Sequence, residues 1–415
     1  MSRTRPPRGQ PIPADFAALP DTADLERWDA ADRATRPTRL ARLRERFVGA
    51  GVDAYFGIRR EHMRYLTGFV LADGEENVAG TSGQFVVGGD DVLILADSRY
   101  TIQARREAPD TRLFEAYGNL SSRWPELMAS VGARRVAVEA GFVPHAVWER
   151  LVAAAPDVEL VPIEGWLEAD RAVKEPAEIE RIASACSVAD RALAALLPEI
   201  RAGVTEAVLA LRLEWLMRTG GAEALAFDVA CLSGPEAALP HGAPSDRPVI
   251  DGAVLLFDFG AQVAGYRSDM TRTLFVGEPA ARDLEIYDVV TRAQAAAIGA
   301  LEEAVERAGA GVPPPSGRAI DAVARDVIHA AGYGDHFGHG TGHGIGLATH
   351  EQPTLGRLAS DAPLPSPTVF SVEPGVYLEG ETGVRIEDLL VFDAGAGRVE
   401  RLTRFPREVL VVSGR

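Results

Sequence analysis

Cysteine and lysine are the residue types that this sequence uses least. Cys186 and Cys231 are its only cysteines, they lie far apart, and no C-x-x-C occurs. The chain therefore offers neither a disulfide framework nor a thiolate zinc site, and its cysteine content fits a reducing cytoplasm. Lys174 is the sole lysine among 43 basic residues, which we interpret as a compositional bias towards arginine.

Long apolar segments and positive charge are also scarce. No apolar run is long enough to span a bilayer. The N-terminal segment MSRTRPPRGQPIPADF is charged and proline-rich, and it lacks the apolar core of a signal peptide. The formal net charge is −17, whereas binding to nucleic acid or to anionic lipid requires a basic surface. We expect a cytoplasmic protein without nucleic-acid or membrane partners.

The length of 415 residues predicts two domains, and 47% apolar with 25% charged residues is typical of globular proteins. Residues 1–38 show weak periodicity, which predicts a surface extension. Residues 39–168 alternate short apolar segments with helix-like ones, as in an α/β domain with a largely parallel sheet. Residues 169–415 show two helices followed by strands, and then the same order again. This repetition predicts an α+β domain of two similar halves around a shared sheet.

Three of the eight histidines lie in one segment, Gly338–Pro353, which reads GHGTGHGIGLATHEQP. Every second residue from Gly338 to Gly346 is glycine, which disfavours a helix and suits a backbone that another group approaches closely. Since imidazole binds transition metals and carries protons near neutral pH, His339, His343 and His350 suggest a metal or acid–base site. A flexible loop with scattered histidines is the plain alternative. A phosphate-binding loop would need a glycine pattern that the segment lacks.

Four acidic residues interrupt or follow apolar strands in the C-terminal domain. Asp258 ends VLLFDF, Glu373 follows VFSV, and Glu387 lies in VRIEDLLV. Asp269 follows Asp258 after a predicted turn at Gly260–Gly265, so a hairpin would bring the two together. A single acidic residue in a strand usually lies at the edge of a sheet or forms an ion pair. Burying its charge without a counter-charge costs free energy. Four in one domain, near a histidine cluster, favour a shared site.

Strand alternation places Arg385 and Glu387 on one face and Asp388 on the other, where we expect a structural role. With His343 added, the four carboxylates would form an oxygen-rich site. Zinc bound by H-E-x-x-H would instead take two histidines from one helix. Several carboxylates suit two divalent ions that share a water or hydroxide. The ligand types favour Mn²⁺, with Co²⁺ or Zn²⁺ as alternatives.

The order Asp258, Asp269, His343, Glu373 and Glu387 resembles the metal-ligand set of the pita-bread metallopeptidases. This family, M24, includes methionine aminopeptidase, aminopeptidase P and prolidase. The segments DFGAQVAGYRSDMTRT, HGTGHGIGLATHE, SVEPGVY and GVRIED are similar to its motifs, and the match is dense over the C-terminal domain. The resemblance implies that these five residues hold two divalent metal ions.

Other positions resemble the proline-specific branch of that family. His339 and Arg385 fit this branch rather than methionine aminopeptidase, and His241 in LPHGAP matches a substrate-contacting histidine. The N-terminal domain, including DSRYTIQA at 97–104, resembles the creatinase-type domain. The resemblance implies an α/β creatinase-like N-terminal domain, an α+β pita-bread catalytic domain with pseudo-twofold duplicated halves, and a homodimer or higher homo-oligomer.

The resemblance also implies a mechanism. A hydroxide that bridges two metal ions would attack the carbonyl of an Xaa–Pro bond in a small peptide substrate. Glu373 would carry the proton to the leaving nitrogen. His350 and His241 would polarise the carbonyl or hold the tetrahedral intermediate. His339 and Arg385 would shape the pocket around proline or order the ligands.

The length of the substrate is open at this point. Prolidases cut only dipeptides and bind the substrate carboxylate with a cation, often an arginine just after H-E-x-P. Here that place reads Thr354-Leu355-Gly356, and Arg357 follows later, which favours an aminopeptidase P-like activity on longer peptides. Prolidase is the alternative. The acidic segment Asp73–Glu76 could bind a free N-terminus, although an exposed turn explains it equally well.

Two more distant alternatives involve no peptidase activity. One is a hydrolase of small amides or osmolytes on the same fold, although creatinase-like members work without metal and lack these ligands. The other is a binding protein without catalysis. The intact ligand set and the acidic charge argue against this second alternative.

Overall fold

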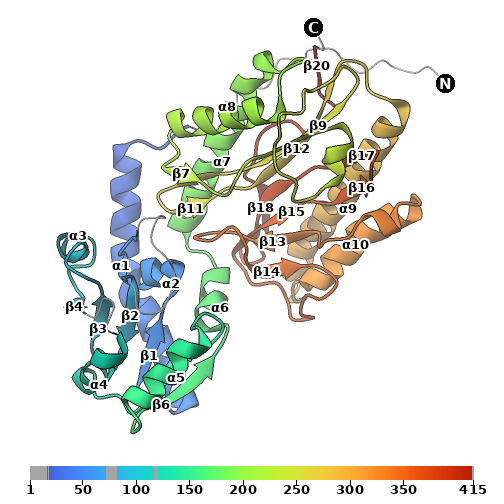
Figure 1. The fold of residues 1–415 in the computed structure, drawn as a ribbon. Helices are drawn as coiled ribbons and strands as arrows, with labels where there is room; N and C mark the ends of the chain where they lie inside the picture. Colours follow the sequence, from blue (N-terminus) through green and yellow to red (C-terminus); the bar gives the residue numbers. More distant parts are fainter. Residues whose placement is uncertain (1–15, 17, 72–81, 116–119, 414–415) are drawn as a thin grey trace. The chain divides into compact units, whose positions relative to one another are not determined.

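The computed structural model describes residues 16, 18–71, 82–115 and 120–413 (Figure 1). The chain divides into two compact units: residues 26–170 form one, and residues 171–415 form the other together with the first 25 residues. The acidic segment Asp73–Glu76 and nearly all of the first 17 residues lie outside the described residues. No helix in the described ranges is long and apolar enough to cross a membrane.

A long helix, α1 (Thr22–Ala50), begins well before the point that the sequence suggested. The prediction of an extension over residues 1–38 is therefore wrong from Thr22 onwards. The helix is only weakly amphipathic and contains Pro37, which explains why periodicity did not reveal it. Trp28 and Phe47 are buried, so one side of α1 packs against neighbouring elements.

The unit of residues 26–170 contains a six-stranded sheet in the order β4-β3-β2-β1-β5-β6. Its strands are β1 (Ala54–Gly57), β2 (Gln84–Val87), β3 (Val92–Leu95), β4 (Arg112–Phe114), β5 (Arg135–Glu139) and β6 (Glu159–Ile163). Its helices are α2 (Arg60–Thr67), α3 (Thr101–Glu107), α4 (Leu120–Ser130) and α5 (His145–Ala154). Helix α6 (Trp166–Ala172) begins in this unit, and its last two residues belong to the other. The predicted α/β architecture is confirmed. However, β2 runs antiparallel to both β1 and β3. The pairing of β2 with β3 follows from the short turn that joins them.

The other unit repeats the order of two helices followed by strands, as the sequence predicted. The first half has α7 (Pro176–Leu196), η1 (Leu197–Glu199), α8 (Glu206–Thr219), β7 (Ala224–Leu225), β8 (Ala230–Ser233), η2 (Gly234–Ala238), β9 (Val254–Phe259), β10 (Ala261–Val263), β11 (Tyr266–Arg267) and β12 (Met270–Val276). Pro176 lies in the first turn of α7, and Thr205 caps α8 by accepting a hydrogen bond from the N–H of Val208.

The second half follows the same plan. It has α9 (Ala281–Ala308), α10 (Gly317–Ala330), η3 (Gly334–His336), β13 (Gly342–Gly344), β14 (Glu351–Leu355), β15 (Thr368–Val372), β16 (Gly375–Leu378), β17 (Thr382–Arg385), β18 (Asp388–Asp393), β19 (Arg398–Arg401) and β20 (Val411–Val412). Helices α9 and α10 lie along the strands of this half (Figure 1). Apolar residues such as Leu301, Ile320 and Phe370 belong to the core between them.

The strands of this unit do not form one shared sheet, which corrects the expectation from the sequence. One larger sheet has the order β20-β12-β9-β8, and another has the order β14-β13-β15-β18-β19. Two small sheets, β11-β10-β7 and β16-β17, complete the arrangement. The N–H of Glu387 donates to the carbonyl of Thr271 at 3.1 Å, so the two halves meet beside the candidate site.

Candidate metal centre

The five ligand candidates lie in strands or directly next to them. Asp258 is in β9, and Asp269 immediately precedes β12, which pairs with β9. Between them, Ala264 and Gly265 have φ angles of 46° and 84° in the two-residue turn that joins β10 to β11. This turn sends the chain back, so that Thr271 lies opposite Asp258 and both aspartates line one cavity. The predicted hairpin is confirmed.

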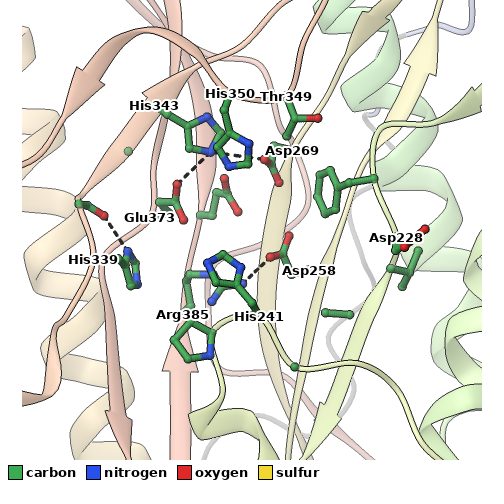
Figure 2. Close-up of a pocket in the computed structure, with 18 of the residues that line it drawn as sticks. Asp228, His241, Asp258, Asp269, His339, His343, Thr349, His350, Glu373 and Arg385 are labelled. Atoms are coloured by element: carbon green, nitrogen blue, oxygen red, sulfur yellow. Dashed lines mark hydrogen bonds and ion pairs between the residues drawn. The ribbon is translucent and has the colours of Figure 1, made fainter. Parts of the chain in front are cut away.

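The second half of the unit supplies the other three candidates. His343 lies in β13, Glu373 follows β15, and Glu387 lies between β17 and β18. His343 Nε2 is 3.2 Å from Glu373 Oε1 and 3.7 Å from Asp269 Oδ2 (Figure 2). Asp269, His343 and Glu387 each offer one ligand atom, and these atoms lie within 4.8 Å of one another. This spacing is suited to one cation between them.

Three buried carboxylate oxygens at this place lack a hydrogen-bond donor among the described groups: Asp258 Oδ1, Asp269 Oδ1 and Glu387 Oε1. Asp269 and Glu387 are 4% and 1% exposed, so water does not solvate them freely. A buried charge without a partner is costly. Carboxylate oxygens with one imidazole are the donor set that Mn²⁺ and similar divalent cations accept. The residues therefore fit a metal site.

The protonation of these groups reflects burial and crowding. Burial and the charges of neighbouring carboxylates raise the pKa of Asp269 and of Glu387 well above the ordinary range. Burial also disfavours the charged forms of His343 and Glu373, but their mutual contact outweighs it. That contact raises the pKa of His343 to about 9 and lowers the pKa of Glu373 to about 2. Carboxylates packed this closely repel one another when ionised, and a divalent cation would remove that repulsion.

Hydrogen bonds fix the orientation of His343. Its Nδ1–H donates to the carbonyl of Gly344 at 3.1 Å, which leaves Nε2 directed at the carboxylates. Ser371 accepts a hydrogen bond from the N–H of His343 at 3.0 Å and donates one to Glu373 at 2.9 Å. The sequence did not single out Ser371, because a serine in an apolar strand carries no recognisable signal.

A second chain of hydrogen bonds links Arg385 to His339. The Arg385 guanidinium pairs with Asp258 and donates to the hydroxyl of Tyr377 at 2.8 Å. That hydroxyl donates to His339 Nε2 at 2.8 Å, since His339 Nδ1–H donates to the carbonyl of Gly340 at 2.7 Å. Burial raises the pKa of Tyr377 to about 12 and lowers the pKa of His339. The neutral phenol is thus a fixed bridge between the two candidates.

Thr271 is a further contact that the sequence did not reveal. Its hydroxyl accepts a hydrogen bond from Arg385 Nε at 2.9 Å and donates one to Glu387 Oε2 at 2.7 Å. Thr271 and Tyr377 both lie inside motif segments quoted above. The sequence therefore placed them near the site but did not indicate which residues they contact.

One cavity of about 590 Å³ collects every site candidate from the sequence (Figure 2). Its lining includes His241, Asp258, Asp269, His339, His343, His350, Glu373, Arg385 and Glu387. The rings of His343 and His350 have centroids 4.3 Å apart. Burial and the charge of His343 lower the pKa of His350. The sequence missed other lining residues, Asp228 and Thr349 among them.

The remaining expectations concern residues outside the cavity. Asp388 points away from it, is fully buried, and accepts hydrogen bonds from Arg272 at 2.7 Å and from Thr403 at 2.6 Å. His329 and His336 are exposed on helix and turn surfaces. The structural role expected of Asp388 agrees with its contacts.

Close backbone approach explains two of the alternating glycines. A Cβ on Gly342 would lie 1.9 Å from the carbonyl oxygen of Ser371, and one on Gly344 would lie 2.1 Å from that of Gln352. Both distances are impossible for a non-bonded pair. Neighbouring strands therefore press directly against the backbone that carries His343, as the glycine pattern suggested.

Comparison with known proteins identifies related sequences and folds. The model of Metallopeptidase family M24 matches residues 180–394, and that of the Creatinase/Prolidase N-terminal domain matches residues 39–173. The uncharacterized peptidase YqhT of Bacillus subtilis is 35% identical over 90% of this chain and 100% of its own length. A solved Xaa-Pro dipeptidase from Bacillus anthracis has a TM-score of 0.81 and 32% identity, covering 91% of this chain and all of that one. An X-Pro aminopeptidase from Thermotoga maritima has a TM-score of 0.74 and 35% identity, covering 87% and 98%.

Proposed function

Since the chain belongs to the metallopeptidase family M24, we propose that it hydrolyses the Xaa–Pro bond at the N-terminus of peptides in a metal-dependent reaction. The observation that carries the proposal is the convergence of four carboxylates and one imidazole, with unpaired carboxylate oxygens, on one cavity. The similarity to an Xaa-Pro dipeptidase and an X-Pro aminopeptidase supports the proline specificity.

Five side chains would hold two divalent ions: Asp258, Asp269, His343, Glu373 and Glu387. Mn²⁺ is our first choice, with Co²⁺ or Zn²⁺ as alternatives, because the donors are mainly carboxylate oxygens. Such ions activate a water molecule as nucleophile and stabilise negative charge on the substrate oxygen.

The chain's own groups would perform the remaining steps. Glu373 lies beside His343 and keeps an ionised carboxylate that can accept a proton and pass it to the leaving nitrogen. His350 is neutral near pH 7, because its pKa is lowered, so its N–H can donate to the scissile carbonyl. His241 would act similarly from another part of the cavity wall. Arg385 would hold Asp258 and, through Tyr377, His339.

The charge of the cavity favours peptides longer than dipeptides. Arg385 is the one arginine among the described lining residues, and no lysine joins it. Its guanidinium is engaged by Asp258, Tyr377 and Thr271. Among the described lining residues, no arginine is therefore available to bind the C-terminal carboxylate of an Xaa-Pro dipeptide. In a longer peptide, the C-terminal carboxylate lies further along the chain, away from the cavity. This supports an aminopeptidase P-like activity.

Xaa-Pro dipeptidase activity is the second candidate. The solved relative with a TM-score of 0.81 is an Xaa-Pro dipeptidase, and the Xaa-Pro dipeptidase of Pyrococcus horikoshii is 36% identical over 67% of this chain and 76% of its own length. Hydrolysis of matched Xaa-Pro and Xaa-Pro-Yaa peptides with Mn²⁺, Co²⁺ and Zn²⁺ in turn decides between the two. Cleavage of the dipeptide alone would reverse our preference. Metal analysis tests the site itself, since a binding protein without catalysis should purify free of stoichiometric metal.

The homodimer and the cytoplasmic location remain predictions. Light scattering of the purified chain measures the first. Fractionation of the producing cells measures the second. Neither result would change the assignment of the site.

A further inference from the structure

A buried ion cluster lies next to the loop that carries His350. Glu351, the first residue of β14, forms ion pairs with Arg171 and, at 3.3 Å, with Lys174. All three side chains are at most 5% exposed. The Lys174 ammonium also donates to the carbonyl of Arg171, so each of the three residues contacts the other two. Burial alone would raise the pKa of Glu351, but the charges of Arg171 and Lys174 lower it to about 2.

The carboxylate of Glu351 also holds the loop directly. Its Oε1 accepts a hydrogen bond from the N–H of Ala348 at 2.7 Å. A Cβ on Gly346 would lie 3.1 Å from each carboxylate oxygen and 3.2 Å from Lys174 Nζ. The glycine therefore lets the ion pair reach the backbone of the loop. Glu351 thereby holds the backbone of the loop at Ala348, two residues before His350.

His350 and Glu351 have different surroundings although they are adjacent in sequence. His350 lines the cavity and lies against His343, whereas Glu351 is not part of the cavity lining. Neighbouring side chains of an extended segment point to opposite sides. Glu351 consequently has no access to the substrate and can influence it only through the backbone that it shares with His350.

Lys174 connects the loop to another part of the unit. It lies between α6 and α7, and its backbone N–H donates to the carbonyl of Pro367 at 2.8 Å. A bias towards arginine explains the abundance of guanidinium groups but not why the sole lysine lies here. The ammonium is compact, and the Cβ distance at Gly346 shows that the space beside it is narrow.

We propose that Glu351, held by Arg171 and Lys174, is a positioning residue that fixes the cavity-facing orientation of His350. The inference rests on the proposed function, in which His350 contacts the scissile carbonyl. In physical terms, a charged and buried cluster anchors the loop through the N–H of Ala348 and packs closely against Gly346. A loop released from this anchor would leave His350 in several orientations, of which few can donate to the substrate.

The test is a double-mutant cycle in the Mn²⁺-loaded enzyme with an Xaa-Pro-Yaa peptide. Glu351→Gln should lower kcat about 10- to 100-fold while KM changes by less than about twofold. In a His350→Ala background, the same substitution should cause less than about twofold further loss, because the residue acts through His350. Equal losses in both backgrounds would overturn the proposal.

Asp190→Asn is the matched control. Asp190 is also a buried carboxylate, and it accepts hydrogen bonds from the backbone N–H groups of Arg404 and Phe405. It does not line the cavity. Its effect on kcat should be the same in both backgrounds. If Glu351→Gln fails to fold by circular dichroism, Lys174→Gln takes its place, since it leaves the pair of Arg171 and Glu351. Lys174→Gln should then lower kcat in the wild-type background but cause less than about twofold further loss in the His350→Ala background.

A second readout needs no substrate. Hydrogen–deuterium exchange of the peptide covering residues 346–350 should become faster in Glu351→Gln and stay unchanged in Asp190→Asn. Unchanged exchange in Glu351→Gln would overturn the anchoring role. If the wild-type enzyme cleaves no Xaa-Pro peptide, the proposed function fails, but this measurement still decides whether the cluster anchors the loop.

Discussion

The guanidinium of Arg385 forms an ion pair with the carboxylate of Asp258 at the wall of the cavity. The pair joins a residue of β17, from the second half of the unit, to a residue of β9, from the first half. Burial raises the pKa of Asp258, whereas the Arg385 charge opposes that rise. Arg385 thus favours the anionic form of a candidate ligand, against the effect of burial, and fixes its orientation.

Replacing Arg385 with lysine should lower kcat/KM about 10- to 100-fold. Lysine keeps the charge but cannot reach Asp258, Tyr377 and Thr271 at once, so the ligand and His339 lose their fixed positions. Kinetics and titration of Mn²⁺ into chelator-treated protein measure the effect. Arg292→Lys, in an exposed pair with Asp288, is the matched control. Full activity of Arg385→Lys would show that the simultaneous contacts of the guanidinium are unnecessary.

Replacing Asp269 with asparagine should remove bound metal and activity together. The same change should raise the melting temperature of chelator-treated protein by about 2–4 °C, the equivalent of about 1 kcal/mol. It removes one of several crowded carboxylates, whose burial and mutual repulsion raise their pKa values. Calorimetry with and without Mn²⁺ provides the comparison. Turnover by a metal-free variant would contradict the proposed function, and a lower melting temperature would contradict the repulsion argument.

His350→Ala should lower kcat about 100-fold or more while the metal content stays at the wild-type value. The neutral imidazole lines the cavity but is not one of the five proposed ligands. His336→Ala, at an exposed histidine, should change neither quantity. Loss of metal in His350→Ala would mean that the residue belongs to the ligand set.

The stability of the protein should fall as pH rises through about 6, in part because of Asp190. Burial raises the pKa of this carboxyl from 3.8 to about 6, against the hydrogen bonds from Phe405 and Arg404. A raised folded pKa means that the folded state binds the extra proton. The stabilisation is therefore complete below pH 4 and is lost as pH rises through about 6.

Asp190→Asn should remove this contribution, which is on the order of 2–3 kcal/mol. Urea unfolding of chelator-treated protein between pH 4 and 7 measures the slope of stability against pH. The variant should show a shallower fall than the wild type. Identical slopes would show that Asp190 titrates at its ordinary pKa. Because the substitution also disturbs two hydrogen bonds, the comparison uses the slope and not the absolute stability.

The sequence revealed the candidate ligands because chemistry and pattern coincide at them. Asp258, Glu373 and Glu387 are carboxylates in apolar strands, an arrangement that is costly without a partner, and His343 lies in an unusual glycine pattern. The turn predicted at Gly260–Gly265 made the meeting of the two aspartates predictable. Such residues can be found without knowing which strands are neighbours.

Residues that act through tertiary contacts could not be found in this way. Tyr377 reaches Arg385 and His339 only because three separate segments of the second half converge, and no local spacing encodes that. The early start of α1 was hidden because residues 22–38 bury little apart from Trp28. The division of strands between two sheets depends on pairing between distant segments, which periodicity does not report.

The glycines around His343 differ in what would obstruct a side chain introduced by mutation. At Gly346 the obstacles to a side chain are the flexible ends of Glu351 and Lys174, which a second mutation could shorten. At Gly342 and Gly344 the obstacles are main-chain carbonyls, which every amino acid carries. No second-site substitution can remove them. Selection for recovered activity after Gly342→Ala or Gly344→Ala should therefore return only true revertants at the mutated codon.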